Sequence, residues 1–125
     1  MNLLLDTSVL VDLLHGRRDR LGLVEELVEM GHRLTTSAMC VAELYAIMHP
    51  GEEERTQNLL AGLACYPVTT EIAARAGNLK REMEGRGDRV TLADMTIAAT
   101  AQEHGLRLVT RRDFPLEEIV FYALP

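Results

Sequence analysis

The sequence is poor in cysteine, has a single lysine and contains no long apolar run. Its two cysteines, Cys40 and Cys65, are too few for a disulfide scaffold and match no zinc-ligand spacing. No apolar stretch approaches the roughly 20 residues that a membrane-spanning helix needs. Residues 1–6 lack a basic segment and reach an acid at once, so we expect no signal peptide. These absences exclude a disulfide-rich or membrane-spanning protein and predict a location in the reducing cytoplasm.

The residues that are present are typical of one ordinary globular domain. Of the 125 residues, 47% are hydrophobic and 26% are charged, a balance that allows one sizeable core. Neither an internal repeat nor a linker rich in glycine, proline or serine divides the chain. We therefore expect a single domain over residues 1–125.

The chain is acidic. It has 13 Lys and Arg residues against 19 Asp and Glu residues, which gives a net charge of −6. This balance argues against a protein that holds nucleic acid chiefly by a broad basic surface. All basic residues except Lys80 are arginine. The arginine fork suits phosphate groups, but surface salt bridges also explain the bias, and we favour that explanation.

Short apolar runs alternate with helical apolar spacing along the whole chain, between glycine and proline stops. The expected strands cover residues 2–5, 33–36, 65–68, 106–110 and 119–123, and the expected helices cover residues 7–14, 19–30, 37–48, 52–64, 70–84 and 91–104. This alternation predicts an α/β fold with a mainly parallel sheet. Ligands of such sheets bind at the carboxyl ends of the strands, so we expect the chemistry there.

Two acids stand where a solvated surface acid is not expected. Asp6 closes the first strand, and it is either a helix N-cap or a functional carboxylate, since Thr7 or Ser8 could cap the helix instead. Glu43 lies on a helix where a carboxylate needs a partner or a metal. The residues one turn from it are apolar or nearly so: Met39, Cys40, Ala46 and Ile47. We favour a functional role for Glu43. The alternatives are a buried hydrogen bond to Tyr45 or to a backbone group, or a position at the edge of the core where the carboxylate is solvated.

Two further acids have structural explanations when each is taken alone. Residues 91–94 fit a capping box in which Asp94 reaches back to the first turn, although this acid opens the most apolar helix of the chain. Asp113 follows the fourth strand, where a salt bridge with Arg111 or Arg112 is commonplace. The other acids that we interpret as solvated surface include Asp12, Asp19, Asp88 and residues 52–54.

The four candidate acids are more informative as a set, because each stands at a strand end or near the start of a helix. Carboxylates can share a site only if a cation neutralises them. Ligands that are all oxygen suit Mg²⁺ or Mn²⁺ rather than zinc, and such ions assist the hydrolysis of phosphodiesters. The set therefore predicts this chemistry, provided that the fold brings the acids together.

Four segments, spread over the whole chain, together carry a family resemblance. They are residues 4–12, 37–44, 92–101 and 108–111. In this order they resemble the PIN domain and, more narrowly, the VapC-type toxins of bacterial and archaeal toxin–antitoxin pairs. Each motif is modest by itself, but four in order within 125 residues are specific.

The resemblance implies a three-layer α/β/α PIN-like domain with a mainly parallel central sheet of four to five strands. It implies a Mg²⁺- or Mn²⁺-dependent endoribonuclease that acts as the toxin of a toxin–antitoxin pair. It further implies a set of site residues: Asp6, Glu43, Asp94 and Asp113 as catalytic acids that bind the metal, and Ser8 and Thr110 as supporting polar residues. The chain departs from the family around Asp113, because the loop after Thr110-Arg111 is shorter and lacks the usual Asn.

The expected reaction is in-line attack of metal-activated water on a phosphodiester, which leaves a 3′-hydroxyl and a 5′-phosphate. No histidine is well placed as a general base, since all four fall at helix ends or turns: His15, His32, His49 and His104. Arg111 and Arg112 are candidates for binding RNA phosphate. A salt bridge with Asp113 or Glu117 explains the presence of these arginines equally well.

The partners expected from the resemblance are an RNA substrate, an antitoxin protein and a second copy of the chain. The helices that follow Ser37 and Glu52 would supply a homodimer face and a groove for the antitoxin, whose tail would insert a basic residue into the acidic site. From the residues alone, the methionines and the cluster Tyr45, Ile47 and Met48 are most simply core.

Three other classes of protein compete with this interpretation. A phosphorelay receiver needs an acid pair at the first strand and a late lysine, but the one lysine, Lys80, falls within a helix. A haloacid-dehalogenase-like phosphatase needs Asp where Ser8 stands. A catalytically degenerate PIN fold that only binds RNA or protein is the remaining alternative, and the presence of Asp6, Glu43 and Asp94 speaks against it.

Overall fold

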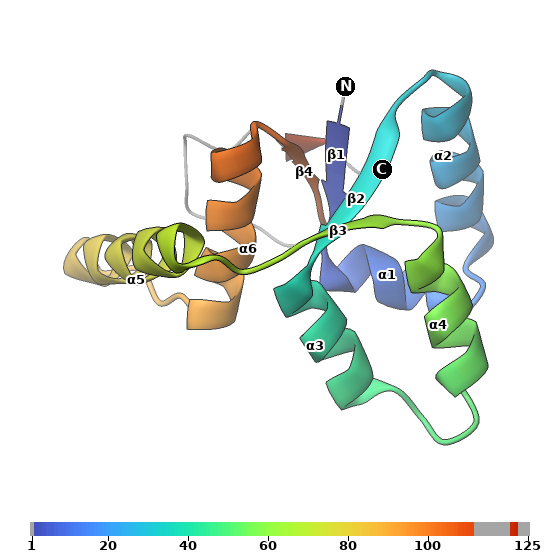
Figure 1. Ribbon diagram of the computed structural model, residues 1–125, viewed down its shortest axis with the longest axis horizontal. Coiled ribbons are helices and arrows are strands. Elements are labelled where there is room, and N and C mark those ends of the chain that lie inside the picture. Colours follow the sequence, from blue (N-terminus) through green and yellow to red (C-terminus); the bar gives the residue numbers. More distant parts are fainter. Residues whose placement is uncertain (1, 112–120, 123–125) are drawn as a thin grey trace.

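A five-stranded parallel sheet forms the centre of the protein (Figure 1), for which the computed structural model describes residues 2–111, 121 and 122. The strands are β1 (Asn2–Leu5), β2 (Arg33–Ser37), β3 (Ala64–Tyr66), β4 (Arg107–Val109) and β5 (Phe121–Tyr122). Their order in the sheet is β3-β2-β1-β4-β5, and every neighbouring pair is parallel. The expected parallel sheet of four to five strands is confirmed.

In the described part of the chain, six helices connect the strands and cover both faces of the sheet. They are α1 (Thr7–Leu14), α2 (Arg18–Glu29), α3 (Ala38–Ile47), α4 (Glu53–Ala61), α5 (Thr70–Gly85) and α6 (Leu92–His104). In Figure 1, α5 and α6 lie on one side of the sheet and α2 and α4 lie on the other, while α3 extends beyond the end of β2. The three-layer α/β/α fold is therefore confirmed, and no helix in the described residues is long and apolar enough to cross a membrane.

The core sits around β1 and α6, which are the most thoroughly buried elements. Leu3, Leu4 and Leu5 are fully buried, as expected for a central strand of a parallel sheet with both faces covered. Residues 95–101 of α6 are all buried, so this helix is enclosed around its whole circumference. An acid at the first turn of such a helix is therefore held in a rigid setting.

The order of the strands fixes where a site can form. The chain leaves β1 toward β2 and β3 on one side, then crosses back to β4 and β5 on the other. In doubly wound sheets, ligands bind at the carboxyl ends of the strands where the direction of winding reverses. Here that point lies between the ends of β1 and β4, which are Leu5 and Val109.

One expected core cluster is only partly buried. Tyr45 is 40% exposed and Ile47 is 53% exposed. The reason is that α3 carries apolar residues on all sides, while only Cys40 and Leu44 face the core. The assignment of Tyr45 and Ile47 to the core was therefore wrong, and α3 presents an apolar surface to solvent. Of the methionines, Met83 and Met95 are buried as expected, but Met30 is 68% exposed, so its assignment to the core was wrong.

Candidate functional site

Asp6 lies at the switch point of the sheet, directly after β1, and its carboxylate is buried. It caps α1, because its Oδ1 accepts a hydrogen bond of 3.3 Å from the backbone N–H of Val9. The hydroxyl of Ser8 donates to the same oxygen at 2.5 Å, and the hydroxyl of Thr110 donates to Oδ2. Asp6 therefore caps α1 and also accepts hydrogen bonds from hydroxyls that follow β1 and β4. The expectation that Thr7 or Ser8 could cap the helix instead was wrong.

Glu43 is tied to the same strand end through the residue that follows Asp6. The hydroxyl of Thr7 donates to Oε1 of Glu43 at 2.7 Å. Glu43 comes from the second turn of α3 and is half-buried. The alternative bond to Tyr45 is not formed, since the described partner of Glu43 is Thr7. This contact brings α3 and the start of α1 together at the carboxyl edge of the sheet.

Asp94 lies in the first turn of α6, at the end of that helix nearest α3 (Figure 1). Its backbone N–H donates to the hydroxyl of Thr91, the N-cap residue, at 3.0 Å. This is the first of the two bonds expected of a capping box. The carboxylate is half-buried and stands at the N-terminal end of the helix.

The three described acids border the same edge of the sheet without forming a tight cluster. Within the part of the chain that the structure describes, the set of three possible ligands whose atoms all lie within 4.8 Å of one another is His15, His49 and Glu52. Asp6, Glu43 and Asp94 do not all lie that close to one another. The fourth expected acid, Asp113, lies outside the described residues, as does Arg112.

Asp12 is a residue whose importance the sequence analysis missed. It is only 7% exposed, not solvated surface as expected. Its Oδ2 lies 3.1 Å from Nε of Arg20, which is also buried, and 3.3 Å from Nε of Arg111. Arg17 adds a longer contact of 3.5 Å. A signal was present, because Asp12 follows Ser8 by one helical turn and stands between buried apolar positions of α1.

Arg111 links this buried pair to the site. Its backbone N–H donates to the hydroxyl of Ser8 at 3.2 Å, while its half-exposed side chain reaches Asp12. Arg111 therefore does form a salt bridge, with Asp12 as the acid. The arrangement places one guanidinium beside the residues that hold Asp6.

Cys40 is buried near the same edge of the sheet, and its thiol is in an unreactive setting. Burial raises the pKa of its thiol, while hydrogen bonds with Ser37, Thr36 and Thr7 act in the opposite direction. The hydroxyl of Ser37 lies 3.2 Å from Sγ. Because the thiolate is the reactive form, a buried thiol with a raised pKa is a poor nucleophile and a poor metal ligand.

The fold and the site define an α/β domain with a buried carboxylate, Asp6, at the switch point of a parallel sheet. The chain belongs to the PIN domain family, since the model of that family matches residues 3–121.

Named relatives agree with this assignment. The chain is 37% identical over 87 residues to Ribonuclease VapC10 of Mycobacterium tuberculosis, across 68% of this chain and 65% of that relative. The match thus spans less than two thirds of the length of this relative.

Two solved structures share the fold. The VapBC2 structure from Rickettsia felis, bound to a DNA fragment from its promoter, superposes with a TM-score of 0.82 at 21% identity over 98% of both chains. A toxin–antitoxin complex from Klebsiella pneumoniae gives a TM-score of 0.65 at 30% identity over 88% of this chain and 86% of that one.

Proposed function

We propose that this chain is a metal-dependent endoribonuclease and the toxin of a toxin–antitoxin pair, and that it acts as a single PIN domain in the cytoplasm. The observation that carries the proposal is the position of Asp6: it is buried at the switch point of the sheet and held by Ser8 and Thr110. The similarity to Ribonuclease VapC10 supports hydrolysis of RNA.

The side chains at this edge fit a hard divalent cation. Asp6, Glu43 and Asp94 offer only carboxylate oxygens, which are the ligands that Mg²⁺ and Mn²⁺ prefer. Mg²⁺ usually keeps several of its waters and takes one or two carboxylates directly. A set of acids that do not all lie within 4.8 Å of one another suits such a hydrated ion, with some of the acids acting through water. In this proposal Asp113 is a fourth acid of the set.

The chain's own residues position the reacting groups. A bound cation would stabilise charge on the phosphoryl oxygens and lower the pKa of water. Ser8 and Thr110 donate to opposite oxygens of Asp6 and so fix the orientation of its carboxylate. Thr7 does the same for Glu43. Arg111 and Arg112 are proposed to bind RNA phosphate, with Asp12 orienting the guanidinium of Arg111.

Two observations support the proposed partners: the exposed apolar face of α3 and the similarity to a chain of a toxin–antitoxin complex. Ala42, Tyr45, Ala46 and Ile47 are exposed there, and exposed apolar patches on helices mark protein interfaces. A second copy of the chain and an antitoxin are the proposed partners. The antitoxin is supported by the similarity to a chain of the Klebsiella pneumoniae toxin–antitoxin complex.

Cleavage of a panel of RNAs tests the proposal. The full chain is incubated with tRNA, rRNA fragments and mRNA in Mg²⁺ or Mn²⁺, and the products are mapped for 3′-hydroxyl and 5′-phosphate ends. Wild type and the matched control Glu29→Gln, an exposed acid of α2, should cut, whereas Asp6→Asn and Glu43→Gln should cut more than about 100-fold more slowly. Equal cleavage by all four proteins, or RNA binding without cleavage by any of them, would overturn the proposal, and the second result would favour the binding module.

A further inference from the structure

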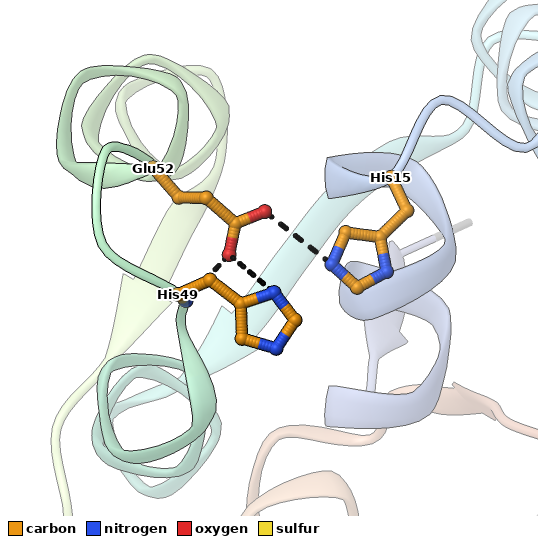
Figure 2. A group of neighbouring side chains, drawn as sticks. All are labelled: His15, His49 and Glu52. Atoms are coloured by element: carbon orange, nitrogen blue, oxygen red, sulfur yellow. Dashed lines mark hydrogen bonds and ion pairs between the residues drawn. The ribbon is translucent and has the colours of Figure 1, made fainter.

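Two histidines and a glutamate come together at the end of α1 opposite Asp6. Figure 2 shows the carboxylate of Glu52 between the imidazole rings of His15 and His49. Nε2 of His15 lies 3.4 Å from Oε2 of Glu52, and Nδ1 of His49 lies 3.7 Å from Oε1. His15 is the C-cap residue of α1, while His49 and Glu52 belong to the connection between α3 and α4. The trio therefore joins three helices.

We infer that His15, His49 and Glu52 form a binding site for a transition-metal cation, with Zn²⁺ as the ion that fits it best. Two imidazole nitrogens and a carboxylate oxygen are ligands that zinc accepts, whereas Mg²⁺ prefers oxygen alone. In tetrahedral zinc sites with bonds near 2.0 Å, neighbouring ligand atoms lie about 3.3 Å apart. The distances of 3.4 Å from His15 to one oxygen of Glu52 and 3.7 Å from His49 to the other are close to that spacing. One ligand atom from each of the three residues lies within 4.8 Å of the other two.

Two of the three ligands come from a rigid turn. The backbone N–H of Glu52 donates to the carbonyl of His49 at 3.1 Å, which closes residues 49–52 into a β-turn. Pro50 restricts the second position, and Gly51 has φ +88°, a conformation that favours glycine at the third. The backbone N–H of His49 also donates to Oε1 of Glu52 at 2.6 Å. The turn thus holds His49 and Glu52 together before any ion arrives.

The third ligand is held against this turn by a separate contact between helices. Nη2 of Arg55, in α4, donates to the carbonyl of Leu14 at 3.2 Å, at the end of α1 and directly before His15. The ring centroids of His15 and His49 lie 5.9 Å apart, with their planes 20° from parallel. Binding therefore requires small side-chain adjustments rather than movement of a helix.

Charge and access also suit a cation. The side chain of Glu52 is only 12% exposed, while His15 and His49 are 47% and 74% exposed, so an ion can enter from solvent past the imidazoles. The hydrogen bond from the backbone of His49 is the largest cause that lowers the pKa of Glu52, with the nearby His49, His15 and Arg55 adding to it. The carboxylate is therefore ionised at neutral pH. Three protein ligands leave a fourth position for water or a partner's side chain.

A zinc clamp here would fix the end of α1 to the α3–α4 connection. Asp6 and Ser8 lie at the other end of α1, and the apolar face of α3 leads directly into the turn. Zinc would thus stabilise the junction between the acid-bearing edge and the exposed helix. This inference does not depend on the proposed nuclease activity.

Calorimetric titration with ZnCl₂ tests the site, using the full chain without a histidine tag in excess Mg²⁺ to occupy carboxylate sites. Wild type should bind one Zn²⁺ per chain, and His15→Gln, His49→Gln and Glu52→Gln should each weaken binding more than about tenfold. His104→Gln and Cys65→Ser, which alter possible ligands elsewhere, should bind as wild type does. Zinc at a hundredfold excess over its dissociation constant should raise the Tm of wild type by about 5–10 °C.

Two results would overturn the inference. The first is an unchanged zinc affinity in the double variant His15→Gln, His49→Gln, with far-UV circular dichroism confirming that the variant is folded. The second is Co²⁺ binding whose visible absorption is the same in wild type and in His49→Gln, because imidazole ligation should alter that spectrum.

Discussion

At the scale of single residues, Asp6 combines a structural role with a proposed chemical one. Its Oδ1 caps α1 through Val9, and both of its oxygens accept hydroxyl hydrogen bonds, from Ser8 and Thr110. The described bonds that orient the carboxylate come from residues at the end of β4 and the start of α1. The central sheet therefore helps to fix the orientation of this acid.

Removal of the Thr110 hydroxyl should reduce activity and preserve the fold. Thr110→Val keeps the shape of a buried side chain but deletes the donor to Asp6. Losing a residue that orients a metal ligand typically costs about 10- to 100-fold in activity or metal affinity. The matched control is Thr100→Val, which removes a buried hydroxyl bonded to Thr96 within α6. Equal RNA cleavage rates for the two variants would contradict the role assigned to Thr110.

The buried pair of Asp12 and Arg20 should respond asymmetrically to substitution. Asp12→Ala leaves Arg20 buried, and Nη1 of Arg20 already lacks a hydrogen-bond partner among the described residues. We expect a loss of about 3 kcal/mol in the free energy of unfolding. Arg20→Met should cost less, because Arg17 and Arg111 still contact Asp12. Urea unfolding measures both values, and an equal or reversed order would refute this account of the pair.

The places of Asp6, Glu43 and Asp94 in the fold could be predicted from the sequence, but their contacts could not. A strand end located Asp6, an apolar helix face located Glu43, and the start of the most apolar helix located Asp94. The bond from Thr7 to Glu43 joins residues 36 positions apart, and Arg111 reaches back to Asp12. Such contacts depend on how the elements pack, which local patterns do not encode, and Asp12 was misjudged for that reason.

At the scale of elements, α6 ends in a motif that requires its glycine. Gly105 has φ +61°, the N–H of Leu106 donates to the carbonyl of Ala101 at 2.8 Å, and the N–H of Gly105 donates to that of Gln102. This pattern is a Schellman cap, which satisfies the last carbonyls of the helix. It turns the chain directly from α6 into β4, the strand that leads to Thr110.

Two glycine substitutions should therefore have opposite effects. Gly105→Ala forces a Cβ into the left-handed conformation and should destabilise the protein by about 1 kcal/mol. Gly77→Ala lies within α5, where an added Cβ meets open space, and should stabilise it by about 0.5–1 kcal/mol. Thermal and urea unfolding report both changes, and shifts of the same sign would contradict the backbone argument.

Every helix and strand was located from the sequence within a few residues of its position, because apolar spacing and glycine stops mark the elements strongly. The largest difference is α4, which ends at Ala61 rather than at residue 64. Gly62 ends the helix, and the chain enters β3 at Ala64. Burial on α3 was harder to predict, since a helix that is apolar on every side gives no periodic signal for the face that packs inward.

At the scale of the whole molecule, the location of the acidic residues matters more than the net charge. The net charge of −6 excludes a broad basic surface for nucleic acid. Part of the negative charge lies at one edge of the sheet, where the proposed cation would neutralise it as RNA approaches. The acidic composition is therefore compatible with a metal-dependent nuclease.

The exposed face of α3 should control self-association. Ile47→Arg places a charge in the proposed dimer face, whereas Val28→Arg makes the same change at an equally exposed site on α2. We expect light scattering with size-exclusion chromatography to give a dimer for wild type and Val28→Arg and a monomer for Ile47→Arg, because an unpaired charge in an apolar interface is costly. A monomeric wild type, or a dimer that Ile47→Arg leaves intact, would refute the interface.

The most direct test of the central claim is the rate of RNA cleavage as a function of Mg²⁺ concentration. Wild type and Asp88→Asn, a matched change in the loop between α5 and α6, should both show a rate that rises to saturation and falls to background in EDTA. Asp94→Asn should cleave more than about 100-fold more slowly at every Mg²⁺ concentration. Cleavage that persists in EDTA, or an Asp94→Asn rate equal to that of wild type, would contradict the account.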